Sequence, residues 1–146
     1  MDREEVLHVL EGIRFFKEFT PEQIDTMIGD EPNVSEYGLA DFVVKQGEVD
    51  SRFYVLLKGA LYVTKDDLPD FVINKLKQGM VFGEMGILSK NPRSANVIVY
   101  TDATVLVIDY EKLPEEIKDV FKAQCIGLLI NCIEDANRQM LKLLVI

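Results

Sequence analysis

The sequence predicts an α+β fold that is mainly β, with a barrel or sandwich of short strands between helices at both ends. Apolar residues in the first 28 positions and after Asp109 recur at the three- and four-residue spacing of amphipathic helices. Between Asn33 and Asp109 the chain changes to short runs of Val, Ile, Tyr, Phe and Leu, separated by Gly, Asp and Asn. With 146 residues, of which 48% are hydrophobic, the chain is expected to form a single domain, residues 1–146.

Two short helices are predicted in residues 1–30. The apolar face of the first is formed by Val6, Leu7, Leu10, Ile13 and Phe16. The second has a clear start, because Thr20 suits the N-cap, Pro21 suits the first helical position and Gln23 can complete a capping box. Gly29 is expected to end it.

Seven strands are predicted in residues 33–109. They are Val34–Tyr37, Asp41–Lys45, Phe53–Lys58, Ala60–Thr64, Phe71–Leu76, Asn96–Tyr100 and Thr104–Asp109. Turns are predicted at Gly47, Gly59, residues 66–70 and Gly79. Strands and turns at such short intervals are typical of a barrel or sandwich.

Residues 110–146 are predicted to be helical, with Pro114 at a helix start or between a short helix and a longer one. An apolar stripe along the longer helix comprises Ile126, Leu129, Ile130, Ile133, Ala136, Met140, Leu143 and Leu144. Such a stripe has to be buried. It can pack either on the barrel of the same chain or on a second copy of the chain in a dimer, and the sequence leaves both alternatives open. Cys125 and Cys132 share a helix face, where we expect buried thiols that cannot bridge to each other.

The overall charge restricts the partners. Lys and Arg number 16 against 25 Asp and Glu, and the formal net charge of −9 repels polyanions, so a direct nucleic-acid partner is not expected. No apolar run approaches the roughly 18 residues that span a bilayer, so we expect no membrane partner and a cytoplasmic location. The single histidine, His8, argues against a His-rich metal cluster and against His-based acid–base catalysis.

Residues 82–97, between two predicted strands, carry the candidate chemistry. Gly83 has no side chain to block close approach, so the N–H groups of Gly83, Glu84 and Met85 can face an anion at the positive end of a short helix. Such an arrangement suits one phosphate group.

Three further side chains indicate a nucleotide rather than inorganic phosphate. The Arg93 guanidinium can hold two phosphate oxygens in a planar fork, and Ser94 adds a hydroxyl. The Glu84 carboxylate beside a phosphate costs energy unless it accepts from a donor such as a ribose hydroxyl. Apolar walls for the base are available from Val72, Val81, Leu88 or Val97.

Two motifs of this sequence resemble those of a known family. The string Phe82-Gly83-Glu84-Met85-Gly86-Ile87-Leu88, followed by Pro92-Arg93-Ser94-Ala95-Asn96-Val97, resembles the phosphate-binding cassette of the cyclic-nucleotide-binding domain family. Upstream, Lys45-Gln46-Gly47-Glu48, Phe53-Tyr54-Val55-Leu56 and Gly59 resemble the paired-glycine strand signature of that family. The resemblance, from about Asp41 to Leu113, implies a double-stranded β-helix or jelly-roll barrel (residues 33–109, cassette 82–94) with N-terminal helices and a C-terminal helical segment.

The resemblance also implies roles for individual residues. Gly83 and its neighbours Phe82 and Met85 would contact the cyclic phosphate, Glu84 would accept the ribose 2′-hydroxyl, and Arg93, with Ser94 beside it, would pair with the phosphate. Gly86 together with residues 93–95 is more similar to the bacterial catabolite-activator branch, in which a continuous C-terminal helix would bring Arg138 and Gln139 near the base. The choice between cAMP and cGMP stays open, with a lean to cAMP.

The leading hypothesis is therefore a regulatory sensor that binds cAMP or cGMP and relays binding through movement of its C-terminal helix. No cofactor, metal or catalytic residue is expected, because the site segment lacks a nucleophile–base pair. One alternative is a ligand-free scaffold or dimerisation protein on the same fold. Another is the sensor fragment of a transcription factor, which the acidic charge disfavours. The apolar end, residues 143–146, predicts a partner interface or a segment of a longer protein, and a homodimer through the C-terminal helix is preferred.

Overall fold

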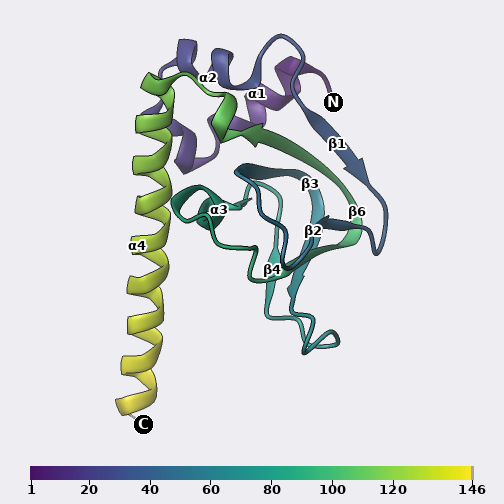
Figure 1. The fold of residues 1–146 in the computed structure, drawn as a ribbon, viewed down its shortest axis with the longest axis vertical. Helices are drawn as coiled ribbons and strands as arrows, with labels where there is room; N and C mark the ends of the chain where they lie inside the picture. The colour runs from purple at the N-terminus through teal and green to yellow at the C-terminus, as the bar shows by residue number, and fades with distance from the viewer. Residues whose placement is uncertain (146) are drawn as a thin grey trace.

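The computed structural model describes the backbone of residues 1–145 and the side chains of residues 1–142. The helical elements are α1 (Arg3–Glu11), the 3-10 helix η1 (Arg14–Glu18), α2 (Pro21–Ile28), α3 (Glu84–Leu88), the 3-10 helix η2 (Tyr110–Lys112) and α4 (Glu115–Val145). The strands are β1 (Val34–Tyr37), β2 (Phe42–Val44), β3 (Arg52–Thr64), β4 (Asn74–Leu76), β5 (Val81–Phe82) and β6 (Asn96–Asp109). In Figure 1, α4 runs along one side of the molecule, and α3 lies between α4 and the strands.

The β part is built around the two long strands β3 and β6. They pair antiparallel from Arg52–Asp109 to Thr64–Asn96, and β1 and β2 pair with β6 while β4 and β5 pair with β3. The strongly curved β6 closes the strands around an interior (Figure 1). This arrangement confirms the predicted α+β fold with a barrel of the jelly-roll type, flanked by helices at both ends, although more residues lie in helices than in strands.

The prediction of separate strands on either side of Gly59 is wrong. Residues 52–64 form one strand, and Gly59 sits inside it at an irregularity of the pairing with β6. Gly59 has a left-handed φ of +93°, and a Cβ at this position would lie 2.4 Å from the Asp102 carbonyl oxygen. Glycine is therefore needed here because β3 and β6 approach each other closely, and not because the chain turns. The predicted break at residues 101–103 is also absent, because β6 is continuous there.

Three smaller expectations also need correction. The strand predicted over Phe71–Leu76 is only Asn74–Leu76, since the exposed side chains of Phe71 and Ile73 face no partner layer among the described residues. The short strand β5 was not predicted. At the N-terminus, α1 ends at Glu11 and the separate helix η1 follows, so three helical elements replace the expected two. The capping box between Thr20 and Gln23 is present as predicted.

An aromatic cluster joins the terminal helices to the barrel. The rings of Phe15 from η1, Phe53 from β3 and Phe121 from α4 have centroids 4.7 to 5.0 Å apart. Their contacts belong to a core that includes α1, α2 and the first half of α4, whereas a second apolar cluster fills the barrel itself. The first half of α4 is thereby fixed on the same core as the N-terminal helices.

The apolar stripe of α4 is not buried by its own chain. Ile126, Ile130, Ile133 and Met140 are 44 to 59% exposed, so the interpretation in which the stripe packs on its own barrel is wrong for these residues. The face of α4 that packs on the core is formed by Ile117, Phe121 and Cys125, which are spaced one helical turn apart. Ile130 follows Phe121 by nine residues, which places it on the opposite face at about 3.6 residues per turn. The predicted stripe residues Leu143 and Leu144 lie outside the described side chains.

The two cysteines differ. Cys125 is buried on the core face of α4, as predicted, but Cys132 is exposed, which corrects the expectation of two buried thiols. Burial, together with the nearby Glu84 carboxylate, raises the pKa of the Cys125 thiol to about 12.

None of the helices in residues 1–145 is long and apolar enough to cross a membrane.

Candidate ligand-binding site

Helix α3 and the loop after it form the centre of the predicted cassette. Gly83 occupies the N-cap position of α3 with a left-handed φ of +97°, and a Cβ there would lie 2.8 Å from the Arg52 carbonyl oxygen. No side chain caps the first turn of α3. The predicted single helical turn is therefore present, its amino end has no side-chain cap, and it depends on glycine at position 83.

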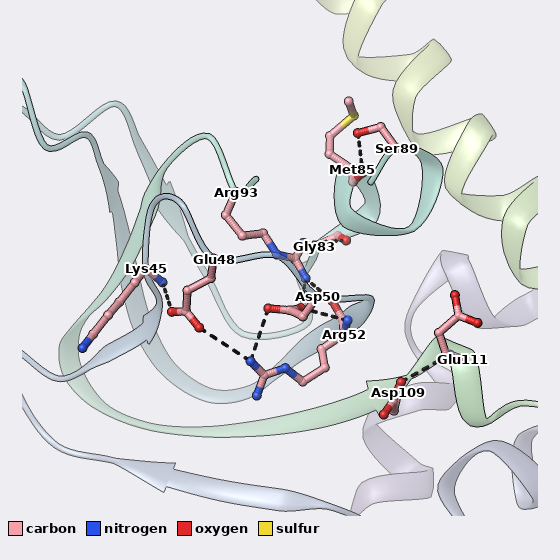
Figure 2. A network of polar contacts seen from close by, with 10 residues as sticks. All are labelled: Lys45, Glu48, Asp50, Arg52, Gly83, Met85, Ser89, Arg93, Asp109 and Glu111. Carbon is pink, nitrogen blue, oxygen red and sulfur yellow. Dashed lines mark hydrogen bonds and ion pairs between the residues drawn. The ribbon is translucent and has the colours of Figure 1, made fainter. Parts of the chain in front are cut away.

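Arg93 points inward beneath α3 and not outward to solvent (Figure 2). Its Nη2 donates to Asp50 Oδ1 at 2.5 Å and to the Arg52 carbonyl oxygen at 2.7 Å, while Nη1 donates to the Gly83 carbonyl oxygen at 3.0 Å. The side chain is only 7% exposed, and its buried Nε has no hydrogen-bond partner within the described part of the chain. We call this arrangement the inward position of Arg93.

The backbone connects the cassette to the upstream motif. The Gly47 amide donates to the Arg93 carbonyl oxygen at 2.8 Å, and the Arg93 amide donates to the Glu48 carbonyl oxygen at 2.7 Å. The Asn96 side chain adds a third link by accepting from the Gln46 amide at 2.7 Å. The two motifs recognised separately in the sequence are thus neighbouring parts of one site.

Sequence reasoning did not find Asp50 as a site residue. Burial alone would raise the pKa of Asp50, but hydrogen bonds from the Arg52 amide and from the Arg93 and Arg52 guanidinium groups outweigh it and hold the pKa below its usual 3.8. Its carboxylate is therefore ionised and paired at neutral pH. A chemical signal was available: a buried arginine requires an acidic partner, and Asp50 lies two residues before β3, a strand of the site.

This pairing predicts a pH dependence of stability. Because the folded pKa of Asp50 is lower than the unfolded one, its contribution is fully present above about pH 3.8 and is lost as the pH falls through the folded value. Asp50→Asn should lower the free energy of unfolding at neutral pH, and the difference from the wild-type protein should shrink in acid. Urea unfolding at a series of pH values measures both effects. The exposed Asp67→Asn serves as control, and a difference for Asp50→Asn that does not change with pH would contradict the pairing.

The other predicted contact residues occupy different surroundings. Glu84 is half-buried at the start of α3, and its carboxylate makes no hydrogen bond or ion pair in the described structure. Met85 and Ser94 are exposed. Phe82 is buried instead, with its ring stacked on Tyr54 at a centroid distance of 4.9 Å, so it belongs to the barrel interior.

The six candidate base contacts are not brought together. Val97 faces the barrel interior, whereas Val81 and Leu88 pack against the core shared with the terminal helices. Val72 lies in an irregular segment before β4. Gln139 is exposed, and Arg138 is exposed and paired with Asp135 on α4 itself. Contact of these residues with a base stays a prediction.

Helix α3 touches α4 directly. Ile87 and Leu88 of α3 pack against the core to which Phe121 and Cys125 of α4 belong. The carboxylate of Glu84 is close enough to Cys125 to raise the pKa of its thiol. Helix α3 lies beside α4 in Figure 1, and a displacement of α3 would therefore act on α4 through these packed side chains.

Comparison with known proteins identifies the family. The profile of the cyclic nucleotide-binding domain matches residues 35–119, more than half of the chain. The chain belongs to the cyclic nucleotide-binding domain family. This family membership confirms the predicted class of function, a regulatory domain for cyclic nucleotides, and the region matched contains both sequence motifs and α3.

Curated relatives of the family are much longer than this chain. Cyclic GMP-dependent protein kinase 2 of Mus musculus is 36% identical over 113 residues, which cover 74% of this chain and 15% of the kinase. The cyclic nucleotide-gated channel beta-3 of Canis lupus familiaris is 37% identical over 78 residues, which cover 51% of this chain and 10% of the channel.

Solved structures of the family share the fold. The catabolite activator protein of Thermus thermophilus has a TM-score of 0.71 at 22% identity, and the match covers 88% of this chain and 62% of the activator. The regulatory subunit of a cAMP-independent protein kinase A from Trypanosoma brucei has a TM-score of 0.72 at 18% identity, covering 96% of this chain and 48% of that subunit.

Proposed function

We propose that residues 1–146 form one regulatory unit that binds cAMP or cGMP at the cassette and relays binding through α4. The observation that supports this proposal most strongly is the Arg93 guanidinium, a buried cation held beneath the uncapped amino end of α3, with Nε lacking a partner in the described chain. A buried donor without an acceptor costs free energy, which an anionic ligand group can recover. The unit is proposed to act by binding and not by catalysis.

In the proposed complex the phosphate lies at the start of α3. There the amides of residues 83–85 and the Arg93 guanidinium supply donors, and Ser94 adds a hydroxyl. The unpaired Glu84 carboxylate accepts from the ribose 2′-hydroxyl. A phosphate donor set next to a hydroxyl acceptor favours a cyclic nucleotide over inorganic phosphate.

Different observations favour cAMP and cGMP as the ligand. The residues at 86 and 93–95 resemble the catabolite-activator branch and favour cAMP, whereas the likeness over 113 residues to a cGMP-dependent kinase favours cGMP. The Trypanosoma brucei subunit belongs to a kinase described as cAMP-independent, so likeness of fold does not fix the ligand. Both nucleotides therefore enter every binding experiment. The cytoplasmic location and the absence of a direct nucleic-acid partner stay part of the proposal.

Replacement of Glu84 tests the orientation of the ribose. Glu84→Ala should weaken binding of cAMP or cGMP roughly tenfold or more, because a hydrogen bond to a charged acceptor is lost. Binding of the 2′-deoxy nucleotide should hardly change, since that ligand has no hydroxyl to donate. Calorimetric titration measures both affinities, with Glu22→Ala on α2 as the control. Equal losses for the two ligands would refute the proposed role of Glu84.

We further propose that the exposed stripe of α4 pairs with a second copy of the chain. Ile126, Ile130 and Ile133 are exposed, away from the face of α4 that carries Phe121, and this apolar row has no partner within residues 1–142. The variant Ile130→Glu, Ile133→Glu should shift the protein from dimer to monomer in sedimentation equilibrium. Asn131→Glu, at an exposed polar position between them, should leave the dimer intact. A wild-type protein that is monomeric at all concentrations would overturn this interface.

A further inference from the structure

Gly86 leaves the space that the Arg93 guanidinium occupies. A Cβ added to Gly86 would lie 2.4 Å from Arg93 Nη1 and 2.6 Å from Arg93 Cζ, far inside normal contact distance. The backbone of Gly86 lies inside helix α3 and not among the residues with positive φ, so alanine suits its conformation. Glycine at this position therefore serves the placement of Arg93 and not the geometry of the turn.

The inward position makes Arg93 a poor phosphate ligand as it stands. A guanidinium has five N–H donors, and three of them are already directed at Asp50, the Arg52 carbonyl and the Gly83 carbonyl. The two remaining donors, on Nε and Nη1, do not lie on the same edge of the guanidinium, so they cannot form a planar fork, and the side chain is only 7% exposed. To offer a fork to a phosphate, the guanidinium has to give up part of this arrangement.

We propose that Gly86, together with Asp50, sets the affinity for cyclic nucleotide by stabilising the inward position of Arg93 against the position that binds phosphate. This inference rests on the proposed function. A protein whose binding-competent state is only partly populated binds its ligand more weakly by that fraction. Gly86 is thus a positioning residue that acts on the ligand through Arg93.

The direct test is Gly86→Ala in calorimetric titrations with cAMP and cGMP. The methyl group removes the space for the inward position, so affinity should rise roughly 3- to 10-fold. In an Arg93→Ala background, Gly86→Ala should leave the nucleotide affinity unchanged, because the Arg93 side chain that it displaces is absent. Gly127→Ala is the matched control, since it also lies in a helix and its added methyl group would meet no atom within 4 Å. Weaker binding for Gly86→Ala, or an equal change in both backgrounds, would overturn the proposal.

A second variant covers the case in which Gly86→Ala disturbs α3, since the new Cβ would also lie 2.8 Å from the Asp50 carbonyl oxygen. Asp50→Asn adds no volume and weakens the hold on the Arg93 guanidinium, together with the ion pair between Asp50 and the exposed Arg52 side chain. It should also tighten nucleotide binding, and only when Arg93 is present. Unchanged or weaker binding by Asp50→Asn would contradict the competition between the two positions of Arg93.

A measurement without ligand separates failure of this inference from failure of the proposed function. Urea unfolding of the wild-type protein, Gly86→Ala, Arg93→Ala and the double variant forms a thermodynamic cycle. Gly86→Ala should destabilise the wild-type protein clearly more than it destabilises Arg93→Ala. If the two substitutions change the free energy of unfolding additively, Arg93 does not occupy the inward position. A coupled cycle with no binding of either nucleotide would keep the inward position but reject the proposed function, and with it the role of Gly86 in affinity.

Discussion

Arg93→Ala is expected to weaken binding of the cyclic nucleotide roughly 30- to 150-fold. The substitution removes a charge-assisted contact to the phosphate worth about 2–3 kcal/mol, and about 1.4 kcal/mol corresponds to a tenfold change in affinity. Calorimetric titration of the purified chain measures the effect. The variant should remain folded, because the two apolar clusters do not include Arg93.

The same variant also removes one of the two arginine partners of Asp50 and leaves it paired with Arg52 alone. The free energy of unfolding should therefore fall, since the Asp50 carboxylate and two carbonyl oxygens each lose a donor. Arg14→Ala, which removes an exposed arginine on η1, controls for the loss of one positive charge. Nucleotide affinity that is unchanged in folded Arg93→Ala protein would refute the assignment of the cassette.

Phe121→Ala is expected to produce the largest loss of stability. Phe121 is fully buried where α4 meets η1 and β3, with its ring 5.0 Å from that of Phe15 and 4.9 Å from that of Phe53. Truncation of a buried phenylalanine costs about 3–5 kcal/mol, because the surroundings fill the cavity only in part. Urea or thermal unfolding measures the difference.

Its control is the adjacent exposed Lys122→Ala on the same helix, which should stay within about 0.5 kcal/mol of the wild-type protein. A loss below about 1 kcal/mol for Phe121→Ala would mean that α4 is not fixed on this core. In that case the contact between α3 and α4 could not carry the relay proposed above.

Local signals predicted much of the fold correctly. The capping box at Thr20, the change of pattern after Asn33 and the exact span of β1 all depend on residues that are close together in the sequence. The uncapped turn at Gly83 belongs to the same class, because glycine before a short helix is a local feature. These are the features that single-residue propensity and spacing determine.

The features that were missed depend on contacts between distant parts of the chain. Gly59 has the composition of a turn, but its role is set by Asp102 on the neighbouring strand. Asp50 becomes a site residue only because the fold brings it to Arg93, 43 positions away in the sequence. The inward position of Arg93 requires the space at Gly86, which no spacing rule reveals. The predicted base contacts on α4 depend on where a long helix lies relative to the barrel, which its own sequence does not determine.

The most direct test of the account is a calorimetric titration of the purified chain with cAMP and with cGMP, with 5′-AMP as the control for generic phosphate binding. We expect micromolar or tighter binding of at least one cyclic nucleotide and little binding of 5′-AMP, which has no cyclic phosphate. The titration is repeated at a second temperature, so that a binding enthalpy that happens to be zero does not hide the reaction. No heat with either cyclic nucleotide at both temperatures would contradict the account and favour a ligand-free scaffold on the same fold.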